Sequence, residues 1–346
     1  MKKYKILVLE DRSYYKGLMD FDEKLYDIQY NGLKYYKSDL KQYDLIISFN
    51  YLSDLGNFII VKAKVQGVKS LLLADGIIEW SNLFNNKDVL DKNLKLFHPI
   101  LHDYFFCVGK QEAFYFNSLG QKTFNYIPTR MKNIKSIKSK TNKSNASTYD
   151  FLLTTANTPY HNDAEKNILL KVFKQIMKEL DNMQCSYAFR IYNEFLIEEL
   201  KISKSENFIE GKFDYIFNDF KCLITTPSSI IISAMECIKP VAQIIYRDTP
   251  LFLQSGWMIT SLNIDTTIKS MLKIEKERMN FQLYQLEYYN SDKADIKDVI
   301  LLPKEKIDLT NDFNKRIYNM LQSKFNFNIE NLVMRLYLKI KYFITR

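Results

Sequence analysis

Two acidic residues follow closely on short apolar segments that are typical of buried strands. Glu10 comes after residues 5–9, and Asp75 comes after residues 69–73 and Ala74. Because the carboxyl ends of parallel strands meet at one edge of a sheet, we expect both carboxylates at the edge where such sheets bind ligands. A pair of this kind can supply a nucleophile and a second group that manages a proton. Gly76 permits a sharp turn that leaves Asp75 facing a cleft, although an aspartate here can also cap the turn.

Hydroxyl side chains form a second candidate site, within residues 222–246. An apolar run at 222–225 predicts a strand, and a small-residue run at 230–237 predicts a helix that ends before Pro240. Another strand is expected at 241–246. Thr226, Ser228 and Ser229 therefore lie between a strand and a helix start, where free N–H groups and hydroxyls can bind a phosphate. The same serines can also simply cap the helix.

Short apolar strands alternate with helical segments along the whole chain, which predicts an α/β protein with parallel sheets. In the first half, strands are expected at 5–9, 25–30, 43–49, 69–73, 105–108 and 122–127, with helices at 52–66 and 111–118. A second series begins with a strand at 149–154, a helix at 163–180 and a strand at 186–192. We expect Rossmann-like domains at 1–130 and 149–310, a basic linker at 131–148, and C-terminal helices at 311–346.

The second domain carries further candidates near its expected strand ends. Asn157, Thr158 and His161 lie in the loop after the strand at 149–154. Arg190 lies inside the strand at 186–192, where a cation can hold a carboxylate or a phosphate. His161 can equally be a surface histidine without a ligand, and Arg190 can be a paired arginine at a sheet edge.

Composition favours a reduced, globular protein. Apolar residues make up 47% of the 346 residues, which is enough for two sizeable cores. The four cysteines form no CxxC pair, as is usual for reduced thiols in the cytosol. A strand is expected almost at the N-terminus, and no signal peptide is expected before it. No apolar run approaches the ~18 residues that a membrane span requires. We expect a cytoplasmic protein.

The net charge of +9 is concentrated locally. Residues 130–148 contain six basic and no acidic side chains, and residues 331–346 contain four basic and no acidic ones. The first segment is typical of an exposed linker and the second of a basic amphipathic helix, and both can meet an anionic membrane surface. The tail can instead bury its apolar face and complete the fold. No nucleic-acid-binding module is recognised, so no nucleic-acid partner is expected.

Ser228-Ser229, Glu236 and Lys239-Pro240-Val241 resemble the donor-binding element of GT-B glycosyltransferases, in which two Rossmann-like domains with parallel sheets face a central cleft. The segment Asp75-Gly-Ile-Ile-Glu-Trp is followed by Phe97-His98-Pro99 and by a strand that ends at Gly109. This series is similar to the acceptor-side domain of the retaining β-Kdo transferases of bacterial O-antigen and capsule biosynthesis. The resemblance covers about residues 5–260.

The resemblance implies an enzyme that moves Kdo from CMP-β-Kdo to a hydroxyl of a lipid-linked bacterial surface glycan, with retention by double displacement. Asp75 best matches the family's nucleophilic aspartate. Glu10 is the best match for its assisting glutamate, and Asp11 and Glu79 compete for that role. The implied donor contacts are Ser228, Ser229, Thr226, Asn157, Thr158, His161, Arg190 and Glu236. Glu79 and Trp80 are the implied acceptor-side contacts.

The resemblance also implies catalysis without a metal or a cofactor. In addition, it implies C-terminal helices that cross back onto the first domain, and a peripheral position on the inner face of the cytoplasmic membrane. Other readings stay open from the residues alone. One is a GT-B enzyme for another nucleotide sugar, such as a CMP-linked nonulosonic acid or a UDP- or GDP-hexose. Two others are a non-catalytic glycan-assembly subunit and a basic binding protein that owes its affinity to the +9 charge.

Overall fold

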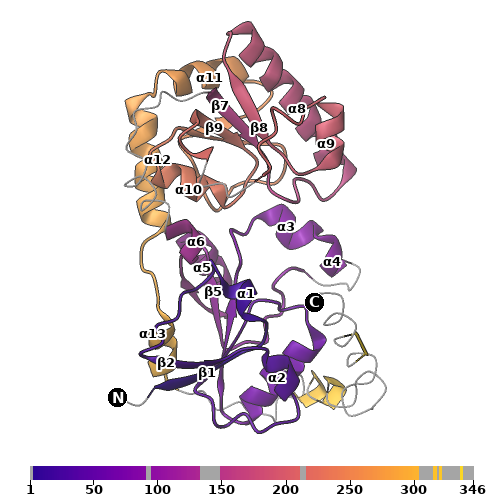
Figure 1. Cartoon of the computed structure of the whole chain (residues 1–346), viewed down its shortest axis with the longest axis vertical. Helices are drawn as coiled ribbons and strands as arrows, with labels where there is room; N and C mark the ends of the chain where they lie inside the picture. The colour runs from indigo at the N-terminus through magenta and orange to yellow at the C-terminus, as the bar shows by residue number, and fades with distance from the viewer. Residues whose placement is uncertain are drawn as a thin grey trace.

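The computed structural model describes residues 3–90, 95–132, 149–210, 216–303, 315–317, 319–321 and 336–337. It contains two domains, one above the other in Figure 1, and each is built on a parallel sheet. The predicted α/β class is therefore confirmed. Most of the predicted linker at 131–148 and of the C-terminal segment at 311–346 lies outside the described residues, and so does nearly all of the basic tail at 331–346.

The first domain holds a six-stranded sheet in the order β2-β1-β3-β4-β5-β6, and all paired neighbours run parallel. Its strands are β1 (Tyr4–Val8), β2 (Tyr26–Gln29), β3 (Leu45–Ser48), β4 (Lys69–Leu73), β5 (Tyr104–Cys107) and β6 (Lys122–Asn125). Its helices are α1 (Arg12–Tyr15), η1 (Gly32–Tyr35), α2 (Asp54–Val65), α3 (Trp80–Asn85), α4 (Lys87–Leu90), α5 (Lys110–Ser118) and α6 (Thr129–Lys132). The strands β3, β4 and β5 are buried along their whole length, as in a parallel sheet covered on both faces.

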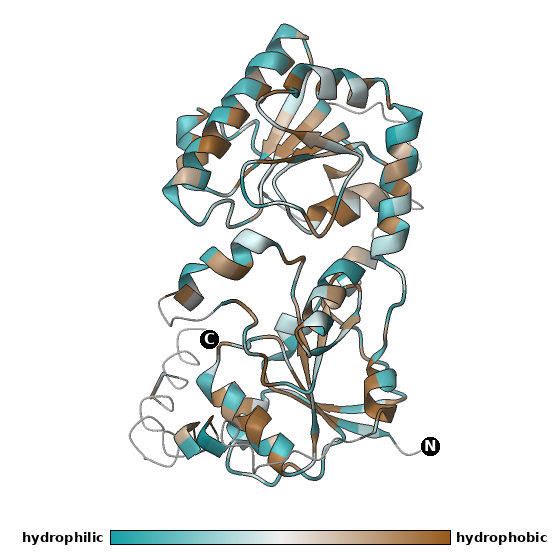
Figure 2. Ribbon diagram, turned by 180° about the vertical axis from the view of Figure 1, so that it is seen from behind, coloured by the Kyte–Doolittle hydropathy of each residue, from teal (hydrophilic) through white to brown (hydrophobic). Residues whose placement is uncertain are grey.

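The second domain holds a five-stranded parallel sheet in the order β11-β10-β9-β7-β8. Its strands are β7 (Tyr149–Thr154), β8 (Tyr187–Arg190), β9 (Phe220–Thr225), β10 (Val241–Ile244) and β11 (Trp257–Ile259). Its helices are α8 (Asp163–Asn182), α9 (Glu194–Glu199), α10 (Ile230–Glu236), α11 (Ile264–Leu272) and α12 (Lys276–Tyr289). In Figure 2 the strands are mostly brown and the outward helix faces mostly teal, so apolar residues are concentrated in the cores.

The chain returns to the first domain after α12, which runs down the side of the molecule in Figure 1. The Asn125 side chain donates hydrogen bonds to the carbonyls of Tyr289 (2.9 Å) and Ser291 (2.8 Å). Helix α13 (Ile296–Leu301) then lies on the first domain, where Lys69 donates to the Val299 carbonyl at 3.1 Å. The return thus falls within residues 149–310, which the sequence assigned to the second domain. Farther along, Leu321 packs in a cluster with residues of α2.

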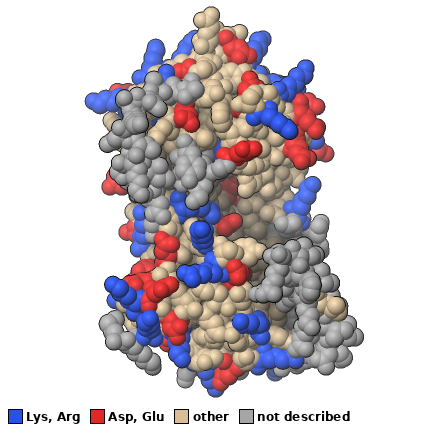
Figure 3. All heavy atoms as spheres, viewed as in Figure 1, with Lys and Arg blue, Asp and Glu red and all other residues tan. Residues whose placement is uncertain are grey.

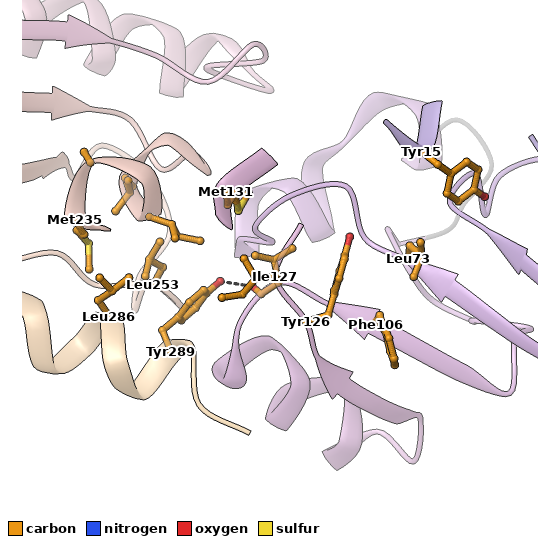
Figure 4. Close-up of a cluster of buried hydrophobic side chains, with 14 of the residues drawn as sticks. Tyr15, Leu73, Phe106, Tyr126, Ile127, Met131, Met235, Leu253, Leu286 and Tyr289 are labelled. Carbon is orange, nitrogen blue, oxygen red and sulfur yellow. Dashed lines mark hydrogen bonds between the residues drawn. The ribbon is translucent and has the colours of Figure 1, made fainter. Parts of the chain in front are cut away.

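A shared apolar cluster joins the two domains beside this return. Figure 4 shows side chains of both domains facing one another in it: Tyr126, Ile127 and Met131 from the first, and Met235, Leu253, Leu286 and Tyr289 from the second and from α12. Tyr289 lies directly over Gly109, whose φ is +118°. A Cβ on residue 109 would come within 1.9 Å of the Tyr289 ring, so only glycine permits this contact.

Glu112 is buried at the same contact. The Tyr289 hydroxyl donates toward both the Val108 carbonyl and the Glu112 carboxyl group. Burial raises the pKa of Glu112 to about 8. A hydroxyl has a single proton, so a neutral Glu112 can donate its own proton to Tyr289 while Tyr289 donates to Val108. The geometry therefore fits a protonated carboxyl group at neutral pH.

The substitution Glu112→Gln tests this protonation. In the wild type, the native state keeps a proton that the unfolded chain loses above the ordinary value of 4.5. The free energy of unfolding should therefore fall as the pH rises from about 5 to 8, with a contribution from Glu112 of up to ~1.4 kcal/mol per pH unit. Glutamine keeps a donor for Tyr289 and should remove that contribution. Urea unfolding across this pH range measures it, with Glu198→Gln at an exposed position of α9 as the control; a wild-type slope in Glu112→Gln would contradict the assignment.

Candidate functional site

A cleft of about 1480 Å³ lies between the two sheets. Its walls are formed by loops that follow β3, β4 and β6 in the first domain, and by loops that follow β7, β8 and β9 in the second. The carboxyl ends of both parallel sheets therefore face the same space, which is where open parallel sheets bind ligands. The site residues predicted from strand ends can be placed against this cleft one by one.

Asp75 is exposed and lines the cleft, directly after β4. Its backbone carbonyl accepts a hydrogen bond from the guanidinium group of Arg130. The next residues of the same loop touch the second domain, because the Ile77 N–H donates to Ser229 Oγ at 3.2 Å. A Cβ on Gly76 would lie 2.7 Å from the same oxygen. The missing side chain at Gly76 thus allows the loop with Asp75 to dock on the Ser228-Ser229 pair.

The hydroxyl residues of the second domain divide into three structural roles. Thr226 is fully buried, and its Oγ1 accepts from the Ala156 N–H at 2.7 Å, so it ties the loops after β7 and β9 together. Ser229 lines the cleft but accepts from Ile77 of the other domain. Ser228 also lines the cleft, and its Oγ accepts from the Ile230 N–H at 3.2 Å. Of the three residues, Thr226 faces a neighbouring loop rather than the cleft. This position does not fit the direct contact with the donor that the resemblance implied.

Glu10 is another predicted site residue with a different environment from the one expected. Its carboxylate accepts from the Tyr15 hydroxyl at 2.5 Å and from the N–H groups of Phe49 (3.4 Å) and Asn50 (3.2 Å). Burial raises its pKa. Phe49 and Asn50 line the cleft, whereas Glu10 is not among the lining residues. Glu10 therefore lies outside the cleft lining and holds the loop after β3 through its backbone N–H groups. These are the contacts of a positioning residue.

The second-domain wall contains Asn157, Thr158, His161 and Arg190, as the sequence predicted for the cleft side. Asn157 and Thr158 are exposed. Burial, with a smaller effect of the nearby Arg247 cation, lowers the pKa of His161, so its imidazole is neutral at pH 7. Arg190 is buried, and its guanidinium group donates to the Phe208 carbonyl. This wall presents amides, hydroxyls and a cation, which suit a ligand that carries anionic groups.

Contacts with other parts of the protein change three further predictions. Trp80 donates from Nε1 to the Pro250 carbonyl at 2.7 Å and packs on Phe252, so it joins the domains and does not line the cleft. Glu236, at the other end of α10, accepts from the Asn290 side chain at 3.3 Å and also lies outside the lining. Glu79 does line the cleft, but its Oε1 forms an ion pair with Arg247.

Several cleft residues were missing from the predicted site. Lys16 and Asn50 line the first-domain wall, and Arg130 reaches the Asp75 loop. Arg130 was assigned to the exposed basic linker, because local sequence could not show that its side chain turns back toward β4. Arg247, which the resemblance to GT-B enzymes made a candidate near the donor base, follows the strand at 241–246 and also lines the cleft. No pattern singled out Lys16.

Charge is spread over the molecule rather than gathered in one patch on the face in Figure 3, where Lys and Arg alternate with Asp and Glu over both domains. Within the described ranges, no three His, Cys, Asp or Glu side chains come together as a metal-binding group. Among the described helices, none combines the length and apolar character that a bilayer crossing requires.

The substitution Gly76→Ala tests the docking of the Asp75 loop. The added methyl group would meet Ser229 Oγ, so we expect weaker docking of the domains, by about 1–3 kcal/mol, as for other overpacked contacts. Small-angle scattering should show a larger radius of gyration, and the thermal midpoint should fall. The double variant Gly76→Ala with Ser229→Gly removes the clash but also the acceptor of the Ile77 N–H, so it should restore both values only in part. If Gly76→Ala alone has the wild-type radius and midpoint, the contact does not hold the domains.

Comparison with known proteins places this geometry among related folds. No protein-family model matches the chain, and no curated protein matches it by sequence. The structure is similar to the S. aureus MnaA–UDP complex, with 14% identity and a TM-score of 0.51 over 89% of this chain and 99% of that one. It is also similar to a putative UDP-N-acetylglucosamine 2-epimerase from Listeria monocytogenes, with 10% identity and a TM-score of 0.52 over 84% of this chain and 93% of that one.

At these identities the similarity establishes the fold alone. Two parallel sheets with a cleft between their carboxyl ends, matched over nearly the full length of both similar chains, agree with the architecture predicted from the sequence. The chain therefore has the GT-B fold.

Proposed function

We propose that this chain is a GT-B glycosyltransferase that takes a nucleotide sugar into the cleft and transfers the sugar to a hydroxyl group. The observation that carries the proposal is the contact between the loop of Asp75 and the Ser228-Ser229 pair. It brings the loop that carries the exposed Asp75 of one domain against Ser229 of the other. In the proposed reaction, Asp75 would be the nucleophile for the anomeric carbon and the serine pair would bind the leaving phosphate.

In its most specific form, the proposal has CMP-β-Kdo as the donor and a lipid-linked bacterial surface glycan as the acceptor. CMP-Kdo carries a phosphate and a sugar carboxylate, and both are anions. Ser228, Asn157, Thr158 and His161 supply hydrogen-bonding groups on the second-domain wall, and Arg190 supplies a buried cation. These groups support an anionic donor on that wall.

Asp75 would act by double displacement. Its carboxylate forms a bond to the anomeric carbon while the bond from that carbon to the phosphate oxygen breaks, and CMP leaves with the electron pair. The acceptor hydroxyl then attacks the same carbon, releases Asp75 and gives up its proton. Two inversions restore the original configuration, so the transfer retains it.

The acceptor proton needs a second group. Of the carboxylates considered, Glu10, Asp11 and Glu79, only Glu79 lines the cleft. Its Oε2 is buried without a hydrogen-bond partner in the described chain, and burial raises its pKa to about 7. A carboxylate with such a pKa takes up a proton near neutral pH, so the geometry favours Glu79 over Glu10 for this step.

A second candidate donor is a uridine nucleotide sugar, because one similar structure is a complex with UDP and the other is a putative UDP-N-acetylglucosamine 2-epimerase. Thermal unfolding with CMP, UMP, UDP and GDP separates the candidates, since a ligand that binds only the native state raises the midpoint by mass action. We expect CMP alone to raise it clearly, by the equivalent of ~2.7 kcal/mol at a hundredfold excess over Kd. A selective response to UDP or GDP would discard Kdo. No response to any nucleotide would favour a non-catalytic protein.

The substitution Asp75→Asn tests the nucleophile. Asparagine keeps the shape of the side chain but cannot form the glycosyl ester, so transfer should fall on the order of 10³-fold or more. Nucleotide affinity should stay within about twofold, because Asp75 belongs to the chemistry rather than to the nucleotide wall. Asp20→Asn, at another exposed cleft-lining aspartate, is the matched control. A wild-type rate in Asp75→Asn, or a sugar adduct on another residue by mass spectrometry, would assign the nucleophile elsewhere.

The proposal of a lipid-linked acceptor at a membrane depends on the sequence alone. The basic segments at 130–148 and 331–346 would draw the enzyme to the anionic inner face of the cytoplasmic membrane, where a lipid-linked acceptor resides. These segments lie almost wholly outside the described residues. Membrane attachment therefore stays a prediction from charge and amphipathicity.

A further inference from the structure

Four polar side chains meet where α3 of the first domain approaches the second domain. We call Glu79, Ser81, Glu165 and Arg247 the interdomain network. Glu79 and Ser81 belong to the first domain, and Glu165 and Arg247 belong to the second. Water is almost excluded, since the side chains of Glu79, Glu165 and Arg247 are 12%, 8% and 4% exposed and Ser81 is 1% exposed.

Each charged group of the second domain has a partner in the first. The Ser81 hydroxyl donates to Glu165 Oε1, and Arg247 Nη2 pairs with Glu79 Oε1. Within the second domain, Arg247 Nη1 lies 3.6 Å from Glu165 Oε2. Two carboxylates thus share one guanidinium group, and Ser81 supplies an additional hydrogen bond. Buried charges of this kind are costly when a partner is removed.

Glu165 and Arg247 also hold the cleft-lining loop at 157–162. Glu165 Oε2 accepts from the His161 N–H at 2.8 Å, and the Glu165 N–H donates to Asn162 Oδ1 at 2.9 Å. Arg247 Nη1 donates to the Pro159 carbonyl at 3.3 Å. The loop carries Asn157, Thr158 and His161 into the cleft. The Tyr246 hydroxyl also donates to the Pro159 carbonyl. Two of the residues that fix this loop, Glu165 and Arg247, therefore also bind the first domain.

We infer that Glu165 and Arg247 are positioning residues that couple the conformation of loop 157–162 to the docking of the first domain. When α3 separates, Glu165 loses Ser81 and Arg247 loses Glu79, so both side chains lose the first-domain contacts that orient them toward the loop. Docking of the domains and the loop conformation that binds a ligand then stabilise one another. A nucleotide bound to this loop stabilises docking by the same factor by which docking raises the affinity for the nucleotide. Only this last statement rests on the proposed function.

The substitution Ser81→Ala is the sharpest test, because Ser81 lies in the first domain and outside the cleft lining. It removes a hydrogen bond to a buried carboxylate without touching the loop. Hydrogen exchange reports the local opening of a segment. We expect amide exchange in residues 157–162 of the full chain to accelerate about tenfold, with the His161 amide among the most affected.

Ser70→Ala is the matched control. Ser70 is also buried in the first domain, and its hydroxyl donates to Asp103 Oδ2 at 2.7 Å within that domain. It should lose a comparable hydrogen bond but leave exchange in 157–162 unchanged. Equal rates in both variants, whether both fast or both slow, would overturn the coupling. If Ser81→Ala fails to fold, Glu79→Gln, which changes the first-domain partner of Arg247, is compared with Ser70→Ala in the same way.

The nucleotide arm uses whichever of CMP, UMP, UDP and GDP binds the wild type. Its Kd should rise about tenfold in Ser81→Ala and stay unchanged in Ser70→Ala. An unchanged Kd in Ser81→Ala would overturn the link to the donor. If no nucleotide binds the wild type, the proposed function falls, and the exchange comparison still decides whether the loop and docking are coupled.

Discussion

The close approach of the Gly76–Ile77 backbone to Ser229 is the contact on which the candidate site depends. It lets a loop from one sheet edge lie against a loop from the opposite edge, with a hydrogen bond of 3.2 Å between them. A side chain at residue 76 would occupy the space of Ser229 Oγ. The glycine after Asp75 therefore allows this loop to lie against Ser229 with the Ser229 hydroxyl in its present position.

Buried carboxyl groups recur wherever a loop or a domain must be fixed. Glu10 supports the loop after β3, Glu112 meets Tyr289 where the chain returns, and Glu165 joins a cleft-lining loop to the first domain. Each forms at least one hydrogen bond with a group that is far away in the sequence. A buried carboxyl group without such donors would be costly, so these residues specify one arrangement of the surrounding loops.

Two of the contacts between the domains differ in their chemistry. At the chain return, Tyr126, Ile127 and Met131 pack against apolar side chains and against the ring of Tyr289 (Figure 4). At α3, the contact is a buried set of charges and hydrogen bonds. Apolar packing tolerates small shifts, whereas a charged network is satisfied in a narrow range of geometries. The first contact can keep the domains associated while the second reports how they are docked.

The sequence by itself determined the fold class and the strand ends that form the cleft. Apolar runs of strand length between helical segments predicted two parallel sheets, and strand-end positions identified Asp75, Ser228, Asn157, Thr158, His161 and Arg190 as cleft residues. Only the tertiary structure decided that Thr226, Glu10, Trp80 and Glu236 have their partners outside the cleft, and that Lys16 and Arg130 line it. The physical reason is that local pattern fixes where a side chain lies along its own element. Which distant donor or surface it meets depends on the packing of two domains, and no local spacing records that packing.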